Sequence, residues 1–218
     1  TVCAVSGVRY SSSAEVRRLF ADVLVADLGV DANADFERLV SMNPDLVVMY
    51  SIPGSGDALK SRLDEFGIPV LVLYDYLENS PLARASYIKV FGAVTGRMEQ
   101  ADSIFDGVCS RYHELADAVA ESCHETAKVL MNVPYADAWY VPGGDNYMSR
   151  LVRDAGGEIL GSVPGMSESS IISVEKALEL SRRAHFWLHT GNYESKEALS
   201  ASNELSLIEI PQIYNNTL

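Results

Sequence analysis

Short apolar runs alternate with amphipathic segments through the first third of the chain. Four of the runs have the length and β-branched content of strands, and they lie at 2–5, 23–27, 46–50 and 70–74. Between them, apolar residues recur at helical spacing at 14–20, 36–42 and 56–66. The strand runs are almost continuously apolar, which is typical of parallel strands covered by helices on both faces. This alternation predicts a first α/β lobe over residues 1–76.

A helical pattern without strand runs follows over residues 81–122. Apolar residues keep helical spacing there, and Gly92 and Gly96 predict a break near residues 95–97. Beyond the break, residues 98–121 predict a single helix, about 36 Å long at 1.5 Å per residue. Such a helix is long enough to form a backbone between two lobes.

The alternation of strands and helices resumes after this backbone. Strand runs at 129–133 and 185–189 flank helical patterns at 147–155 and 174–183, and Gly156-Gly157 predicts a helix end. A second α/β lobe is therefore predicted over residues 128–218. The predicted fold class is α/β, with two Rossmann-like lobes that contain central parallel sheets and are joined by a long backbone helix.

Several segments resemble one known family. Residues 36–48, Phe-Glu-Arg-Leu-Val-Ser-Met-Asn-Pro-Asp-Leu-Val-Val, are similar to a segment of the helical-backbone (class III) periplasmic binding proteins, which serve iron-siderophore, haem and cobalamin ABC importers. The same resemblance continues in order through 67–74, 77–84, 87–92, 139–144, 146–151, 154–157 and 173–178. Compared with the family, a strand and helix are expected before residue 1, and helices after a strand near 213–216. The resemblance thus predicts a chain trimmed at both ends, with an incomplete second lobe.

The resemblance implies a binding protein with no catalytic activity and no cofactor of its own. It would capture an iron complex (siderophore or haem) or a corrinoid between two lobes and deliver it to the permease subunits of an ABC importer. It would act in the periplasm or at the outer face of the cytoplasmic membrane, where a lipid anchor can hold the full-length protein.

Two glutamates, Glu37 and Glu175, occupy the positions that the resemblance assigns to permease docking, one on each lobe. Two carboxylates at helix starts present a spacing-sensitive target for arginine side chains, which bind carboxylates through paired hydrogen bonds. The alternative interpretation is that each is an acidic residue that the helix dipole favours near a helix N-terminus. The residues alone favour this second interpretation, whereas the resemblance favours permease docking.

Aromatic and basic residues cluster where the predicted strands end. Because ligands of open α/β sheets bind beyond the strand ends, these residues are candidate ligand contacts. They are Arg9, Tyr10, Tyr50, Tyr76, Trp139, Tyr140 and Tyr193. Aromatic rings stack on flat ligands, and tyrosine hydroxyls bond a ligand's rim or ligate iron. Alternatively, several of them belong to the core, and the sequence leaves siderophore, haem and cobalamin open.

Charge, composition and missing motifs argue against several other classes of protein. The formal net charge of −13 repels a phosphate backbone, so no nucleic acid partner is expected. No apolar run reaches the ~20 residues of a transmembrane helix. Cys3, Cys109 and Cys123 lack metal-like spacing and predict buried thiols. Phosphate-loop, GxSxG and HExxH motifs are also missing from the sequence.

Two rival functions remain open at this point. A receptor for free zinc or manganese ions would need a histidine cluster, and only His185 and His189 fall on one face of a predicted strand. Buried strand histidines more often bond a neighbouring polar group than hold a metal. A carboxylate-dependent hydrolase would use a facing pair such as Asp75 and Glu78.

Overall fold

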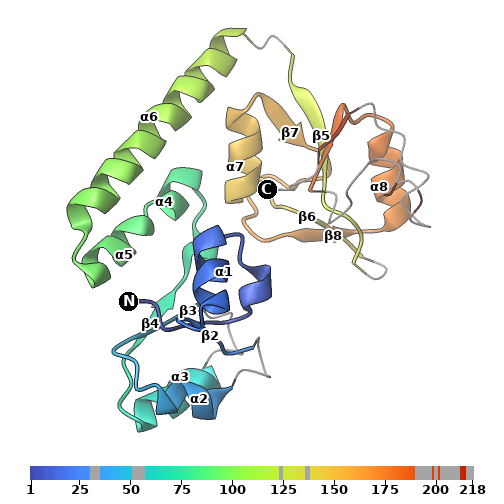
Figure 1. Cartoon of the computed structure of the whole chain (residues 1–218). Helices are drawn as coiled ribbons and strands as arrows, with labels where there is room; N and C mark the ends of the chain where they lie inside the picture. Colours follow the sequence, from blue (N-terminus) through green and yellow to red (C-terminus); the bar gives the residue numbers. More distant parts are fainter. Residues whose placement is uncertain are drawn as a thin grey trace. The chain divides into compact units, whose positions relative to one another are not determined.

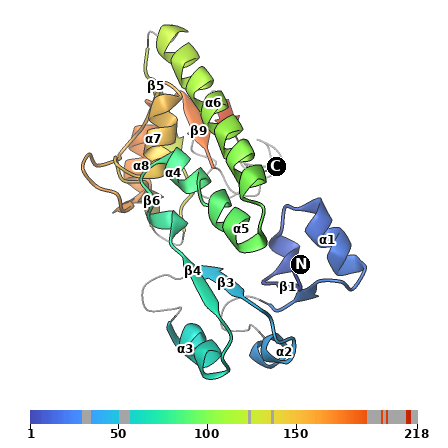
Figure 2. The ribbon, with the colours of Figure 1, turned by 90° about the vertical axis from the view of Figure 1, so that its left-hand side faces the viewer.

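The structure is a computed structural model that describes residues 1–29, 35–50, 57–122, 125–135 and 138–189, with positions 198, 201 and 212–214. It forms two compact units, residues 1–74 and residues 75–217, and Figures 1 and 2 show the elements of each. The boundary between the units falls between Tyr74 and Asp75.

The first unit contains the four predicted strands in two parallel pairs. Strand β1 (Ala4–Val5) pairs with β2 (Ala26–Asp27), and β3 (Val47–Tyr50) pairs with β4 (Val70–Leu73). The helices are η1 (Val8–Tyr10), α1 (Ala14–Ala21), α2 (Phe36–Ser41) and α3 (Asp57–Glu65). The parallel pairing agrees with the apolar strand runs. Burial on both faces was wrong for β3, because Val48 and Tyr50 on alternate positions are exposed.

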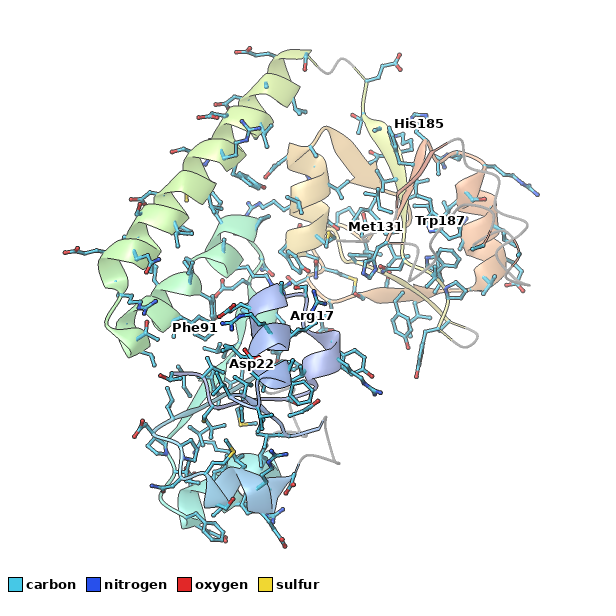
Figure 3. The ribbon with its side chains drawn as sticks, viewed as in Figure 1. Arg17, Asp22, Phe91, Met131, His185 and Trp187 are labelled. Atoms are coloured by element: carbon cyan, nitrogen blue, oxygen red, sulfur yellow. The ribbon has the colours of Figure 1, made fainter. Side chains whose placement is uncertain are left out.

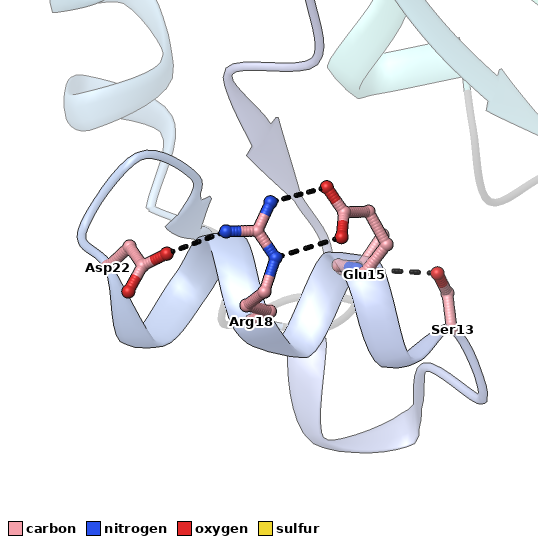
Figure 4. A network of polar contacts seen from close by, with 5 residues as sticks. Ser13, Glu15, Arg18 and Asp22 are labelled. Carbon is pink, nitrogen blue, oxygen red and sulfur yellow. Dashed lines mark hydrogen bonds and ion pairs between the residues drawn. The ribbon is translucent and has the colours of Figure 1, made fainter.

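Local polar contacts stabilise helix α1, none of whose residues is fully buried. The Ser13 hydroxyl accepts a hydrogen bond from the backbone N–H of Val16 and caps the helix. Arg18 then pairs with Glu15 at 2.6 Å and with Asp22 at 3.0 Å along the exposed face (Figure 4). Exposed pairs of this kind add little to helix stability, because solvent screens the charges.

The helical region of the second unit divides at the predicted break. It comprises η3 (Asp75–Leu77), α4 (Pro81–Ala85), α5 (Ile88–Thr95) and the long α6 (Met98–Ser122). Gly96 ends α5 in the left-handed conformation at φ 68°, which glycine adopts without steric cost. The turn sends α6 back along α5, and the two helices pack against each other. No helix among the described residues is apolar and long enough to cross a bilayer.

The rest of the second unit is built on a four-stranded parallel sheet in the order β10-β9-β5-β7. These strands are β5 (Ala127–Met131), β7 (Gly157–Ile159), β9 (Phe186–Leu188) and β10 (Gln212–Tyr214). An antiparallel pair, β6 (Trp139–Val141) with β8 (Ser170–Ile172), accompanies helices α7 (Tyr147–Asp154) and α8 (Val174–Ser181). The pair was not predicted, because its strands are only three residues long.

Two tryptophans form the centre of the second unit's core. Trp139 and Trp187 are both 0% exposed, and their rings stack with centroids 6.1 Å apart. Each indole N–H is satisfied by a backbone carbonyl, Trp139 by Met131 at 2.7 Å and Trp187 by Asn132 at 2.8 Å. The apolar area and the satisfied donors together make this pair a rigid packing centre.

Candidate functional site

The loop after β1 carries the first two predicted ligand residues, Arg9 and Tyr10. Tyr10 is 69% exposed. A guanidinium nitrogen of Arg9 donates to the Tyr10 hydroxyl at 2.6 Å, and the guanidinium carbon lies 4.6 Å from the ring centroid. The two side chains therefore form one exposed unit that combines positive charge with an aromatic surface.

Asp27, at the end of β2, holds this loop in place. Its carboxylate accepts hydrogen bonds from the backbone N–H groups of Gly29 at 2.9 Å, Gly7 at 3.0 Å and Val8 at 3.2 Å. These three donors, Gly29 foremost, lower the pKa of Asp27, so the carboxylate stays ionised at neutral pH. Asp27 was not singled out from the sequence, since its role depends on the pairing of β1 with β2.

Tyr50 and Tyr76 lie on different units. Tyr50 ends β3, where it is in register with Leu73 of β4, and it is 61% exposed. Tyr76 lies within η3 and is partly buried. Both keep some accessible surface, so both remain predicted ligand contacts. Tyr193 lies outside the described residues.

Trp139 requires a correction. It was predicted to contact ligand, but its side chain has no exposed surface and forms the core with Trp187. The physical reason is strand alternation: successive side chains of β6 point to opposite faces, which buries Trp139 and leaves its neighbour Tyr140 40% exposed. Tyr140 thus stays a candidate contact while Trp139 does not.

The carboxyl ends of β5 and β9 bring together a residue pair that the sequence did not reveal. Asn132 and His189 directly follow these neighbouring strands, whose last residues, Met131 and Leu188, are in register. Nδ1 of His189 lies 2.8 Å from Oδ1 of Asn132, and the Asn132 amide nitrogen donates to the carbonyl of Tyr140 at 2.8 Å. The pair therefore lies at the sheet edge where open α/β proteins bind ligands.

His185 lies at the other end of the same strand. Figure 3 shows it at the upper end of the sheet, above Met131 and Trp187. Its Nδ1 accepts a hydrogen bond from the backbone N–H of Lys128 at 3.2 Å. The two histidines that were predicted to share a strand face are thus at opposite strand ends and bond different polar groups. Neither belongs to a metal-holding group of three His, Cys, Asp or Glu within the described part of the chain.

Glu37 and Glu175 lie in matching local frames. Each is the second residue of its helix, α2 or α8, and each is exposed. The capping residues, Asp35 and Ser173, accept hydrogen bonds from the backbone N–H groups three residues on. A hydrogen bond from the Ser173 hydroxyl lowers the pKa of Glu175, which keeps that carboxylate ionised.

A third glutamate shows what distinguishes this pair. Glu15 is also the second residue of a helix, α1, after a serine cap. Its carboxylate is bound by Arg18 at 2.6 Å, whereas neither Glu37 nor Glu175 has an ion pair to any residue that the structure describes. The helix dipole explains all three positions, but only two of the three leave the charge open to a partner.

Other features that the sequence raised have separate structural roles. Asp75 pairs with Arg84 at 3.1 Å, and Glu78 accepts a hydrogen bond from the Tyr87 hydroxyl at 3.2 Å, so these two acids contact different partners. Cys3 is exposed, contrary to the prediction of a buried thiol, because β1 starts only at Ala4. Cys109 is half-buried, and Cys123 lies outside the described residues.

The second unit also has an open pocket of about 460 Å³ between α6 and the turn joining α7 to β7. Polar residues in its lining include Asp117, Glu125, Arg153 and Asp154. It lies where β5 and β7 begin, at the amino ends of the strands. None of the predicted ligand residues lines it.

The fold is that of an α/β protein with parallel sheets and one long helix, α6. Residues 4–209 match the periplasmic binding protein family, and the chain belongs to that family. The solved periplasmic heme-binding protein BhuT, in complex with two hemes, superimposes with a TM-score of 0.70 at 14% identity, covering 97% of this chain and 79% of that chain. This likeness confirms the predicted helical-backbone fold.

Two curated relatives are similar in sequence. An uncharacterized lipoprotein of Methanocaldococcus jannaschii is 24% identical over 178 residues, which are 80% of this chain and 42% of the relative. The uncharacterized ABC transporter substrate-binding lipoprotein YvrC of Bacillus subtilis is 28% identical over 126 residues, 56% of this chain and 39% of the relative. The chain therefore spans less than half the length of these relatives.

Proposed function

We propose that this chain is the substrate-binding component of an ABC importer, acting outside the cytoplasm. It captures an iron chelate, haem or a corrinoid and presents it to the permease through Glu37 and Glu175. Family membership supports the binding role. The docking role rests on the similarity of the two glutamates. Each is the second residue of its helix, each is exposed, and neither has an ion pair to a residue that the structure describes.

Electrostatics favour this docking arrangement. An ionised carboxylate on the first turn of a helix is held in a defined direction, and a permease arginine can bind it through two parallel hydrogen bonds. The formal net charge of −13 also steers the chain toward a positively charged surface. Such charges at the rim of an interface mainly govern association rate and register.

Ligand capture draws on aromatic and basic residues near strand ends. Arg9, Tyr10, Tyr50 and Tyr140 are exposed and offer aromatic surface, hydroxyl groups and one positive charge. Tyr76 is partly buried and would contribute part of its ring, since its hydroxyl oxygen has no accessible surface. This set suits a flat or catecholate chelate that carries negative charge. Tyr193, predicted for the same role, remains part of the proposal.

Transport and binding should be measured separately to test the proposal. The double change Glu37→Ala and Glu175→Ala should abolish uptake in proteoliposomes that contain the permease, while chelate affinity stays within about threefold, or about 0.7 kcal/mol. Glu15→Ala is the matched control, since it removes a glutamate from the same helix position without removing an open charge. Uptake that survived the double change would refute the docking role.

The ligand class is tested by titrating the protein with haemin, ferric siderophores and cyanocobalamin, followed by visible absorbance and tryptophan emission. Both tryptophans of the chain lie in the core of the second unit, so quenching reports a ligand bound near that unit. Failure to bind any of the three classes would contradict the proposed capture function.

A further inference from the structure

The geometry points to Nε2 of His189 as a coordination point for the metal of the captured chelate. The inference rests on the proposed function and deepens it, because it selects the class of chelate. It places this contact at the carboxyl edge of the second unit's sheet, beyond the ends of β5 and β9.

Hydrogen bonding fixes which nitrogen of His189 is free. The Asn132 amide nitrogen donates to the carbonyl of Tyr140, which can only accept, so the Asn132 oxygen must face His189. An amide oxygen can only accept, so Nδ1 of His189 carries the proton of that bond. In the neutral imidazole, the lone pair is then on Nε2. His189 is exposed, so this lone pair is accessible to a ligand.

This arrangement is the one that metal-binding histidines use. Their second ring nitrogen usually donates to a carbonyl or carboxylate, which fixes the tautomer and the ring orientation. Here Asn132 supplies that acceptor, and the carbonyl of Tyr140 fixes Asn132 in turn. The acceptor for Nδ1 is therefore in place without a metal.

The backbone at both positions supports a functional role. Asn132 has φ 67° and His189 has φ 59°, in the left-handed region that non-glycine residues seldom occupy. Such a conformation is unfavourable and persists where the surrounding structure holds it, which is common at ligand sites. Two other described non-glycine residues have positive φ, Val23 and Asn43, and they lie in the first unit. In the second unit, the described non-glycine residues with positive φ are the two that are hydrogen-bonded to each other at the strand ends.

His185 provides an internal contrast. Its Nδ1 accepts the N–H of Lys128, so in the neutral ring its Nε2 carries the proton. Its Nε2 therefore has no lone pair to offer a metal unless the ring changes its tautomer. His185 and His189 thus flank β9 on either side, both are exposed, and they have opposite tautomers. Only His189 has its Nε2 lone pair available to bind a metal.

The number of ligands determines the class of chelate. The described part of the chain holds no group of three metal-binding side chains, so one imidazole would meet a metal that brings its own ligands. That metal must keep an exchangeable position, where the Nε2 lone pair replaces a bound water without any proton or redox change. Iron porphyrins and aquo-corrinoids have such a position. Hexadentate siderophores, which fill all six positions of iron, do not.

Haemin titration of three variants tests the inference. His189→Asn keeps a residue that tolerates the left-handed backbone but removes the imidazole. It should weaken haemin binding at least about tenfold, or about 1.4 kcal/mol, and remove the imidazole-ligated Soret band and electron paramagnetic resonance signal. Asn132→Gly permits the same backbone conformation and removes the side-chain oxygen that accepts from Nδ1 of His189. It should lower haemin affinity about tenfold. His185→Asn, the matched control, should bind within about twofold of the unaltered chain.

A second comparison distinguishes the chelate classes. Aquocobalamin, whose axial water exchanges, should respond to His189→Asn if corrinoids use the site, whereas cyanocobalamin and ferrioxamine should not respond. Unchanged haemin and aquocobalamin binding and spectra in folded His189→Asn would overturn the inference. An unaltered chain that binds ferrioxamine alone would overturn the inference and leave the proposed function standing. Binding of no chelate at all would defeat both.

Discussion

The hydroxyl of Tyr112 donates a 2.6 Å hydrogen bond to the carboxylate of Asp154. Tyr112 lies midway along α6, and Asp154 is the last residue of α7. Helix α6 packs mainly against α5 and has one buried residue, Ala101, whereas its contact with α7 is small. The bond therefore joins the long helix to the part of the unit that contains the sheet.

Removing the hydroxyl of Tyr112 should weaken the contact between α6 and α7 and lower the stability of the protein. Tyr112→Phe leaves the ring and deletes the hydrogen bond to a charged, partly buried acceptor, so unfolding free energy should fall by about 1–2 kcal/mol. Urea denaturation followed by circular dichroism measures it. Tyr135→Phe is the control, because Tyr135 is exposed, and it should change stability by less than about 0.5 kcal/mol.

The same hydrogen bond should make the folding stability of the protein depend on pH in the alkaline range. Burial, followed by the hydrogen bond to Asp154, raises the pKa of Tyr112 to about 12. The folded state therefore holds this proton more tightly than the unfolded state does, so its contribution is full below about pH 10 and is lost as the pH rises toward 12. Tyr112→Phe should flatten that part of the stability curve. An identical alkaline decline in both proteins would contradict the assignment.

The tryptophan pair should behave as core and not as ligand contact. Trp139→Leu removes a stacked ring and an indole N–H bond, so the expected loss of unfolding free energy is about 2–4 kcal/mol. Chelate affinity of the folded fraction should stay within about twofold, whereas Tyr140→Ala should weaken it more strongly with little effect on stability. Calorimetry and chelate titration on both variants separate the two roles. Strong loss of affinity in stable Trp139→Leu would restore it as a contact.

Replacing two glycines by alanine should change the stability of the protein in opposite directions. A Cβ at Gly143 would lie 2.3 Å from the carbonyl oxygen of Met166 and 2.4 Å from that of Glu168, so Gly143→Ala should destabilise the protein by more than about 2 kcal/mol. Gly107 lies within α6, where an added methyl group would meet no neighbouring atom within 4 Å, and Gly107→Ala should stabilise the protein by about 0.5–1 kcal/mol. Thermal unfolding of the two variants gives the comparison.

Asp27 should control the loop that carries Arg9 and Tyr10. Asp27→Asn removes the charge that three backbone N–H groups share, so it should lower the stability of the folded state and speed hydrogen exchange at Gly7 and Val8. Since the pKa of Asp27 is lowered by folding, its contribution is full above about pH 4 and is lost as the pH falls through the lowered pKa. Asp22→Asn, on the exposed end of α1, is the control.

Much of the fold could be predicted because its signals are local. The break at Gly96 and the long helix after it are confirmed, and so are the four strands of the first unit in shortened form. The β6–β8 pair escaped prediction because three-residue strands carry too little periodicity to detect. Burial of β3 was misjudged, because an apolar run does not show how many of its neighbours cover it.

The sequence by itself determined the order of strands and helices in the first unit, the long helix, the acidic charge and the resemblance that family membership confirms. Only the tertiary structure decided which of two adjacent aromatic residues is core, since Trp139 and Tyr140 differ by the alternation of one strand. It also brought Asn132 to His189, 57 positions apart in the chain. Contacts of that range depend on strand pairing and register, which side-chain patterns along a chain do not encode directly.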